Sequence, residues 1–368
     1  MNYMKVAFHL AKLAKGRTSP NPPVGAVLVK SGEIIGKGYT QSPGESHAET
    51  VALNQATRNT KGSVLYTTLE PCHLFGKVPP CTQAIIQHQV KKVYVSILDA
   101  NPKINGRGIN VLREAGIEVI IGEMNKEISE FYLPFAKFIT TNKPFVVVKF
   151  AMSLDGKIAT SNRESKWITS EKARKIVHKL RSQTDVLVIG KGTVETDDPL
   201  LTARKSNGQP LSYQPIRLIL SSDGMIPNNS LIIKQPGKII ITCKKQANSY
   251  VLKERFESQY RKNIEFLPLP YVNNMPNLST LLDVLGKRGC VEVFIEGGEK
   301  IFTAFFEQKL IDKIIAFISP KIIGGRTSPT PFGGDGLQSL ANCPSLDNIQ
   351  IKKIGQDLMV SGYLTEKN

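Results

Sequence analysis

The sequence is poor in several features that define specialised protein classes. It has no apolar run near the roughly 18 residues that span a membrane. Its five cysteines are an odd number without framework spacing, which argues against a disulfide scaffold. It has one tryptophan, and its 31 acidic residues are outnumbered by 48 Lys and Arg, for a net charge of +17. With 41% hydrophobic residues over 368 positions, a soluble globular protein of two or more domains is expected.

The positive charge is spread along the chain. Residues 1–143 carry 17 Lys and Arg against 10 Asp and Glu, and the remainder carries 31 against 21. Diffuse positive charge attracts anions, including phosphorylated metabolites and nucleic acids. A basic host proteome would explain the same excess, so charge alone does not choose a ligand.

The basic N-terminus is compatible with a targeting peptide or with a helix. Lys5, Lys12 and Lys15 interrupt any apolar core of a targeting segment, while Val6, Leu10 and Leu13 recur at helical spacing. We therefore expect an amphipathic helix here.

One histidine, two cysteines and a glutamate suggest a catalytic metal site. His47-Ala48-Glu49 is followed by Pro71-Cys72 and Pro80-Cys81. Three such ligands hold zinc and leave the fourth position for a water, whose pKa the metal lowers. Zinc base deaminases combine H-x-E with P-C-x-x-C, although here nine positions separate the cysteines. The alternative is two inert buried cysteines, as we expect for Cys243 and Cys290; the fifth cysteine fits no motif. Thiolate ligands suit a reducing cytoplasm.

The flanking pattern predicts where these residues lie. Residues 24–29 and 33–39 suggest a hairpin. Ser46 can cap a helix that runs through Ala56. Residues 63–69 suggest a strand that is followed by Cys72 at the N-terminus of a helix. Such a position would favour the Cys72 thiolate. Alternating strands and helices follow to residue 138, which indicates an α/β layer with a mixed sheet.

A linker is expected at residues 140–144, which divides the chain into domains at 1–143 and 144–368. Helices are predicted at 171–181, 278–287 and 300–308, and strands at 145–150, 185–190, 216–220, 238–242, 291–295, 313–319, 349–354 and 358–364. Many strands with few helices favour a dihydrofolate-reductase-like sheet. Gly297-Gly298 follows a strand and opens a helix, where backbone N–H groups suit a phosphate.

Two motif sets in order resemble the bifunctional riboflavin-biosynthesis deaminase/reductases. The first half carries Pro20–Gly25, His47–Glu49, Leu69–Cys72 and Pro79–Cys81. The second carries Ser153–Gly156, Trp167–Ser170, Gly192–Val194 with Asp197–Pro199, and Glu296–Gly298. The resemblance implies a cytidine-deaminase-like three-layer α/β/α domain followed by a dihydrofolate-reductase-like α/β domain.

The resemblance also implies two successive reactions and two cofactors, Zn²⁺ and NADPH. The first is zinc-dependent deamination of 2,5-diamino-6-(5-phosphoribosylamino)pyrimidin-4-one, with His47, Cys72 and Cys81 as ligands and Glu49 as the catalytic proton carrier. The second is reduction of the ribosyl to a ribityl group. The implied cofactor-binding residues are Met152, Trp167, Thr193, Asp197, Ser222, Gly298, Glu299 and Lys300. The implied substrate-binding residues are Ser165, Arg181, Leu201, Arg204 and Glu296. The family suggests a homo-oligomer, a dimer or tetramer, with no nucleic-acid or membrane partner.

Two departures from the family pattern affect the deaminase half. The usual Pro-Cys-Ser-His is Pro71-Cys72-His73-Leu74 here, and Val51 stands where the family often has His. We hypothesise that His73 or Lys77 compensates. The departures leave open a reductase with a weakened deaminase half.

Two further alternatives follow from the motifs. A tRNA adenosine deaminase-like enzyme shares H-x-E and basic charge, but it usually has the short cysteine spacing and leaves the second half without a role. A non-enzymatic regulator with structural zinc would normally have four protein ligands.

Overall fold

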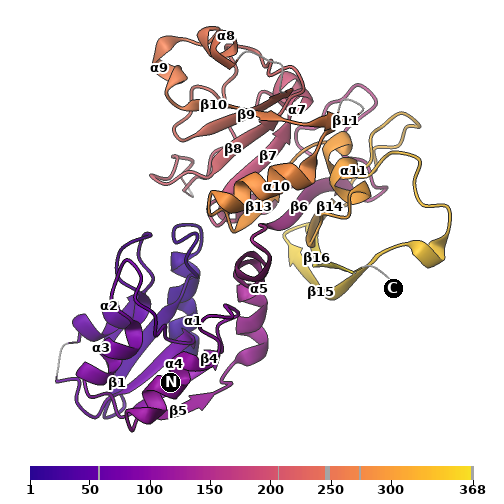
Figure 1. The fold of residues 1–368 in the computed structure, drawn as a ribbon. Coiled ribbons are helices and arrows are strands. Elements are labelled where there is room, and N and C mark those ends of the chain that lie inside the picture. Colours follow the sequence, from indigo (N-terminus) through magenta and orange to yellow (C-terminus); the bar gives the residue numbers. More distant parts are fainter. Residues whose placement is uncertain (57–58, 206, 245–248, 273–274, 366–368) are drawn as a thin grey trace. The chain divides into compact units, whose positions relative to one another are not determined.

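The computed structural model describes residues 1–56, 59–205, 207–244, 249–272 and 275–365. The chain forms two compact units, one of residues 1–144 with 289–291 and the other of residues 145–288 with 292–368 (Figure 1). Residues 140 and 141 of the expected linker belong to the last helix of the first unit, so the connection is shorter than predicted. Among the described residues, no helix is long and apolar enough to cross a membrane.

The first unit is built on one mixed sheet. Its strand order is β2-β1-β3-β4-β5; β1 pairs antiparallel with β2 and β3, and the β3, β4 and β5 pairings are parallel. The elements are α1 (Tyr3–Ala14), β1 (Gly25–Lys30), β2 (Glu33–Tyr39), α2 (Ala48–Asn54), β3 (Val64–Leu69), α3 (Cys81–Gln87), β4 (Lys92–Ile97), α4 (Arg107–Glu114), β5 (Glu118–Ile121) and α5 (Asn125–Thr141). The predicted hairpin, strands and helices of this half are thus present.

Helices pack on both faces of this sheet, and glycines let them approach. A Cβ on Gly25 would lie 2.0 Å from the Ala7 carbonyl oxygen of α1, and one on Gly38 would lie 2.1 Å from that of Ala48 in α2. Gly38 pairs with Ala26, the neighbour of Gly25, and neighbouring residues of a strand point to opposite faces. Helices α1 and α2 therefore lie on opposite faces, and α2 brings His47 and Glu49 to the sheet.

The first helix buries a different stripe from the one predicted. Its buried residues are Met4, Ala7, Phe8, Ala11 and Ala14, whereas Leu13 is exposed and Val6 and Leu10 are only half-buried. Small alanines face the strand because the helix lies so close to Gly25. The helix was correctly predicted, and its buried face was wrong.

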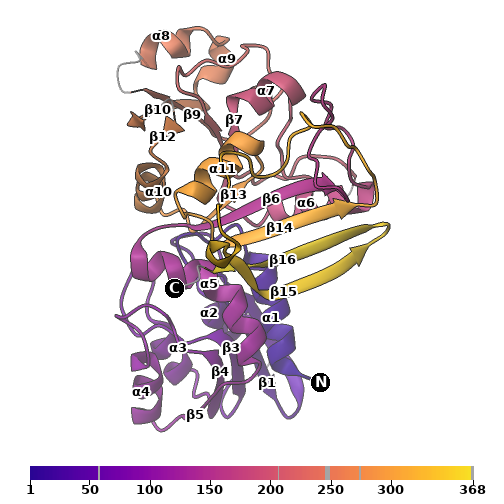
Figure 2. The ribbon, with the colours of Figure 1, turned by 90° about the vertical axis from the view of Figure 1, so that its right-hand side faces the viewer.

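The second unit is built on a nine-stranded sheet of order β10-β9-β8-β7-β13-β6-β14-β16-β15. All neighbours pair in parallel except β16 and β15, which add an antiparallel pair at one edge (Figure 2). The strands are β6 (Phe145–Ser153), β7 (Val186–Gly190), β8 (Ile216–Leu220), β9 (Ile239–Lys244), β10 (Ile264–Leu269), β13 (Glu292–Ile295), β14 (Lys313–Ser319), β15 (Ser345–Ile354) and β16 (Asp357–Thr365). A separate pair is formed by β11 (Tyr271–Val272) and β12 (Met275–Pro276).

The helices of this unit include several that the sequence did not reveal. Those predicted are α6 (Glu171–Arg181), α10 (Leu278–Lys287) and α11 (Glu299–Glu307). Those missed are α7 (Lys191–Asp197), α8 (Ser249–Glu254), α9 (Ser258–Arg261) and the 3₁₀ turn Leu340–Asn342. Helix α6 is capped at its start, because the Ser170 hydroxyl accepts a hydrogen bond from the Ala173 N–H.

Candidate zinc centre and cofactor pocket

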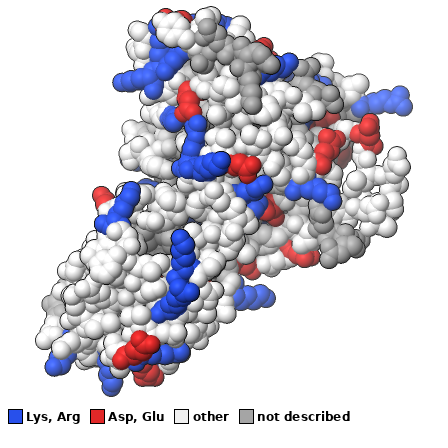
Figure 3. All heavy atoms as spheres, viewed as in Figure 1, with Lys and Arg blue, Asp and Glu red and all other residues white. Residues whose placement is uncertain are grey.

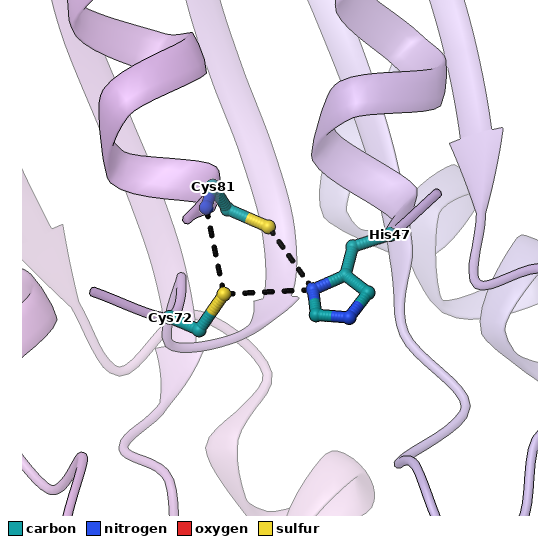
Figure 4. Close-up of side chains that lie close together, drawn as sticks. All are labelled: His47, Cys72 and Cys81. Atoms are coloured by element: carbon teal, nitrogen blue, oxygen red, sulfur yellow. Dashed lines mark hydrogen bonds between the residues drawn. The ribbon is translucent and has the colours of Figure 1, made fainter. Parts of the chain in front are cut away.

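Three side chains of the first unit form a cluster of metal-ligand type. One ligand atom each from His47, Cys72 and Cys81 can be chosen so that all lie within 4.8 Å of one another. The imidazole Nδ1 lies 3.3 Å from the Cys81 sulfur and 3.5 Å from that of Cys72. Figure 4 shows the same ring nitrogen turned toward both sulfurs. The three residues come from the N-cap of α2, the loop after β3 and the first residue of α3.

The helix termini around this cluster differ from the prediction. His47, not Ser46, is the N-cap of α2, and no side chain caps that helix. Cys72 does not begin a helix; it lies in a loop that ends where α3 begins. The Cys81 backbone N–H, at the start of α3, donates to the Cys72 sulfur over 3.4 Å. The N-terminus of α3 thus stabilises the Cys72 sulfur by a hydrogen bond, although Cys72 is not part of that helix.

Hydrogen bonding makes one thiol of the cluster strongly acidic. The contact with the Cys81 side chain, and next the hydrogen bond with His47, lowers the pKa of Cys72 to about 4 against the opposing effect of burial. The same Cys72 contact raises the pKa of His47, and Cys72 together with burial raises that of Cys81. One imidazole and two thiols, one of them readily ionised, are a donor set that fits zinc.

Glu49 lies beside this cluster without belonging to it. Its carboxyl is buried, with 3% exposure, and burial raises its pKa. The Cys81 thiol donates to Oε2 over 3.4 Å, and the Thr67 hydroxyl donates to Oε1 over 3.3 Å. These contacts hold a carboxyl with an elevated proton affinity next to the three candidate metal ligands, as a proton carrier requires.

Glu70 is a structural residue to which the sequence motifs assign no role. One carboxylate oxygen accepts the N–H groups of Asp99 and Gly106, at 3.1 and 2.9 Å. The other accepts those of Gly108 and Ile109, at 2.9 and 3.3 Å. Glu70 therefore binds the start of α4 and the preceding loop to the segment that carries Cys72. Its position two residues before the candidate ligand Cys72 was the only signal in the sequence.

The two residues that depart from the family motifs, Leu74 and Val51, lie in different surroundings. Leu74 is exposed, and Val51 lines a hollow of about 500 Å³ together with Tyr39, Gln41 and Ser46. Among the described residues, the Nδ1 of His73 is buried without a hydrogen-bond partner. The compensation hypothesis for His73 and Lys77 stays a prediction.

The second unit contains a cavity of about 880 Å³ at the carboxyl ends of its parallel strands. Sites for small molecules and cofactors commonly have this size and place. Eight of the expected cofactor and substrate residues line it: Ser165, Thr193, Asp197, Ser222, Glu296, Gly298, Glu299 and Lys300. Gly298 is the N-cap of α11, and no side chain caps that helix. Its backbone N–H groups are thus available for a phosphate.

Five other expected residues are not part of the cavity wall. Met152 belongs to β6, and Leu201 is buried with a positive φ of 48°. The Trp167 ring is exposed, 4.4 Å from the Arg174 guanidinium. Arg204 donates to the Thr202 hydroxyl over 2.8 Å. Arg181 adjoins the cavity through its ion pair with Glu296.

A buried charge cluster connects that ion pair to the cavity. Arg181 donates two hydrogen bonds to the Glu296 carboxylate, at 2.5 and 2.9 Å. Lys149 of β6 lies 3.7 Å from the same carboxylate and lines the cavity. Burial opposes ionisation of Glu296, but Arg181 and then Lys149 hold its pKa at about 2. Burial lowers the pKa of Lys149.

Comparison with known proteins covers both units. Residues 1–97 match the cytidine and deoxycytidylate deaminase zinc-binding region, and residues 144–360 match the RibD C-terminal domain. The riboflavin biosynthesis protein RibD of Aquifex aeolicus is 40% identical over 98% of this chain and 97% of its own. That of Escherichia coli is 35% identical over 97% of each. The chain belongs to the RibD family.

Solved structures agree with this assignment. RibD of Acinetobacter baumannii superposes with a TM-score of 0.85 at 33% identity, over 99% of this chain and 98% of that one. A diaminohydroxyphosphoribosylaminopyrimidine deaminase/5-amino-6-(5-phosphoribosylamino)uracil reductase from Thermotoga maritima gives 0.84 at 32% identity, over 99% and 98%. The expected family and fold class are confirmed, as are a zinc-binding deaminase region and a reductase region within one enzyme.

Proposed function

We propose that the first unit deaminates 2,5-diamino-6-(5-phosphoribosylamino)pyrimidin-4-one at its ring amino group. The observation that carries this proposal is the buried Glu49 carboxyl beside the cluster of His47, Cys72 and Cys81. When bound, zinc supplies an activated water at neutral pH. His47, Cys72 and Cys81 hold the metal. Glu49 takes a proton from the water and delivers it to the departing amino group, while the Thr67 hydroxyl orients the carboxyl.

The second unit reduces the deaminated product with NADPH. The cofactor supplies the hydride. The Gly297–Gly298 turn and Lys300 bind its phosphates, with Thr193, Asp197 and Ser222 along the same wall. Met152 and Trp167 remain proposed cofactor contacts on the strength of the family motifs.

The buried charge cluster lies on the substrate side of this proposal. Arg181 and Arg204 suit the substrate phosphate, because burial and then the nearby charge of Arg181 lower the pKa of Arg204, which indicates two guanidinium groups close enough to share one anion. Ser165 and Leu201 complete the expected contacts. Glu296 holds Arg181 and Lys149 in place, and Lys149, which the motifs did not reveal, lines the cavity.

The alternatives find less support. On the face in Figure 3, Lys and Arg are scattered over both units instead of forming a stripe along which a nucleic acid would bind. A weakened deaminase half conflicts with the complete ligand set and the buried Glu49.

The proposal includes a cytoplasmic homo-oligomer, a dimer or tetramer. Reduced thiols of the ligand type suit that compartment. Strand β15 is the edge of the larger sheet and is largely exposed along its length, with Ile349 and Ile351 at 56% and 67% exposure. Exposed edge strands readily pair with another chain. The domain boundary remains proposed at residues 1–143 and 144–368.

One experiment tests both activities. Purified protein is incubated with the diamino substrate, with and without NADPH. Ammonia release without NADPH supports the deaminase, and NADPH oxidation that requires the deaminated pyrimidine supports the reductase. Oxidation without any ammonia release would favour a reductase whose first unit is inactive. If neither ammonia release nor NADPH oxidation is observed, the proposal is rejected.

A further inference from the structure

Arg163 occupies a backbone position that normally suits glycine. It lies in the loop between β6 and α6, in a tight turn where Thr160 N–H donates to the Glu164 carbonyl over 3.0 Å. The Arg163 N–H donates to the Thr160 carbonyl over 2.9 Å. Its φ is +67°, in the left-handed region. Three-residue loops of this kind usually place glycine or asparagine there. Residues in such strained backbone conformations cluster at functional sites, so the Arg163 side chain is a candidate for a functional role.

The Arg163 side chain is a cation on the cavity wall without a partner. It lines the same cavity as Gly298 and Lys300. Two other cations of the wall are paired, Lys149 with Glu296 and Lys191 with Asp223. Within the described part of the chain, Arg163 forms no ion pair or side-chain hydrogen bond. Its charge is therefore available to an anionic ligand.

The topology brings this loop and the Gly297–Gly298 segment to the same cavity. In the sheet, β13 lies between β6 and β7. The loop leaves β6 and is attached to the end of α7, which follows β7. The Ser165 hydroxyl donates to the Asp197 carboxylate over 3.0 Å, and the Lys166 ammonium donates to the Asp197 carbonyl over 2.5 Å. These attachments link the loop that follows β6 to the helix that follows β7, on the other side of β13, and Arg163 and Ser165 line the same cavity as Gly297 and Gly298, where α11 begins.

The cavity spans the ends of four strands, and β13 and β7 lie in the middle of this row. One end is lined by Lys149 and Glu296, near β6, and the other by Ser222 and Tyr271, beyond β8. With strands about 4.8 Å apart, this width suits an extended dinucleotide. Its central pyrophosphate would then lie between the N-terminus of α11 and the loop that carries Arg163.

We propose that Arg163 binds the pyrophosphate of the reductase cofactor, opposite the Gly297–Gly298 turn. This inference rests on the proposed NADPH-dependent function of the second unit. Arginine matches phosphate oxygens with several N–H donors, and such charge-assisted bonds are stronger than neutral ones. The pyrophosphate is common to NADPH and NADH, so Arg163 contributes to affinity for both and not to the choice between them.

The test compares three substitutions in the full-length protein. Arg163→Gly removes the cation and relieves the backbone strain, Arg163→Asn removes the cation in a residue that tolerates positive φ, and Arg163→Lys keeps the charge. Binding of NADPH and of NADH is titrated by cofactor fluorescence without pyrimidine. We expect the Gly and Asn variants to raise both Kd values about 5- to 20-fold and to weaken their salt dependence. The Lys variant should stay within about 3-fold of the wild type.

Thermal unfolding followed through Trp167 fluorescence supplies the control for folding. The Arg163→Gly variant should melt at or above the wild-type temperature, since its left-handed φ costs glycine nothing. An unchanged Kd in that variant overturns the inference. A loss confined to NADPH also overturns it and assigns Arg163 to the 2′-phosphate instead. If the wild-type protein binds neither nucleotide, the proposed reductase function fails, and the inference fails with it.

Discussion

The Glu49 carboxyl is the only acidic side chain that the described residues place in hydrogen-bond contact with the cluster of His47, Cys72 and Cys81. Replacing it with glutamine preserves its size and its contact with Thr67 but removes the proton carrier. We expect Glu49→Gln to lower the deamination rate by about 10²- to 10⁴-fold. Zinc content should remain near one per chain, because the three ligands are untouched. Ammonia release and metal analysis check this. A fully active variant would assign the proton transfer to another group.

Glu296 makes a second residue-level prediction, which concerns stability and pH. Its folded pKa of about 2 lies below its ordinary 4.5, so its ionised form stabilises the fold. That stabilisation is complete above about pH 5 and is lost as pH falls toward 2. Glu296→Gln should therefore cost roughly 2–4 kcal/mol at pH 7, because it leaves Lys149 and Arg181 buried without a counter-charge.

Urea unfolding of the second unit measures this cost. Trp167, the single tryptophan, lies in that unit and reports its unfolding. The difference between wild type and Glu296→Gln should shrink between pH 7 and pH 3. A difference that is constant over this range would mean that packing, not charge, is what the substitution disturbs.

The sequence predicts the residues of the first site better than those of the second. His47, Glu49, Cys72 and Cys81 are distinctive residue types at distinctive spacings, so local pattern suffices to find them. Lys149 carries no such signal, because it is one polar residue within the apolar strand 145–150. Its role depends on its ion pair with Glu296, 147 positions later, and only the pairing of β6 with β13 brings the two side chains together.

At the level of elements, the zinc site depends on how closely α2 approaches β2. A Cβ on Gly38 would lie 2.1 Å from the Ala48 carbonyl oxygen and 2.6 Å from the Ala52 nitrogen, so backbone must move. Gly38→Ala should displace α2, which carries His47 and Glu49. We expect deamination to fall by at least about 10-fold, with a stability loss of about 1–3 kcal/mol.

Gly25→Ala is the matched control. Its Cβ would lie 2.0 Å from the Ala7 carbonyl oxygen, so it overpacks α1 on the opposite face of the same sheet. Stability should fall by a similar amount, while zinc affinity and deamination in the folded fraction change less. Equal losses of activity in both variants would show that the site follows general stability and not the position of α2.

The helices and strands were predictable where the hydrophobic periodicity agrees with the capping and turn residues that bound the element. The hairpin of β1 and β2, the capped helix α6 and the closing pair β15 and β16 all have strong local signals. Helix α7 was missed because Lys191–Asp197 has only one buried residue, Val194, and so lacks an apolar stripe. The α1 face was mispredicted because alanines, not the larger aliphatic residues, meet the glycine of β1.

At the level of the whole molecule, each proposed reaction uses residues of one unit only. The zinc cluster belongs to residues 1–144, and the cofactor cavity to residues 145–288 and 292–368. Each unit has its own sheet. The deaminated pyrimidine can then leave one chain and react on another. Two variants, each inactive in one step, should therefore complement each other in solution.

Glu49→Gln supplies a chain without deaminase activity, and Gly298→Val supplies one without reductase activity. The valine side chain would enter the cavity beside Thr193, whose hydroxyl lies 4.0 Å from the Cβ position, and block the cofactor without removing a buried charge. Mixed at equal concentration with the diamino substrate and NADPH, they should form the ribityl product after a lag, during which the intermediate accumulates. Each variant alone should form none. If the mixture also forms none although Gly298→Val releases ammonia and Glu49→Gln reduces added intermediate, the intermediate must pass directly between the two sites of one chain.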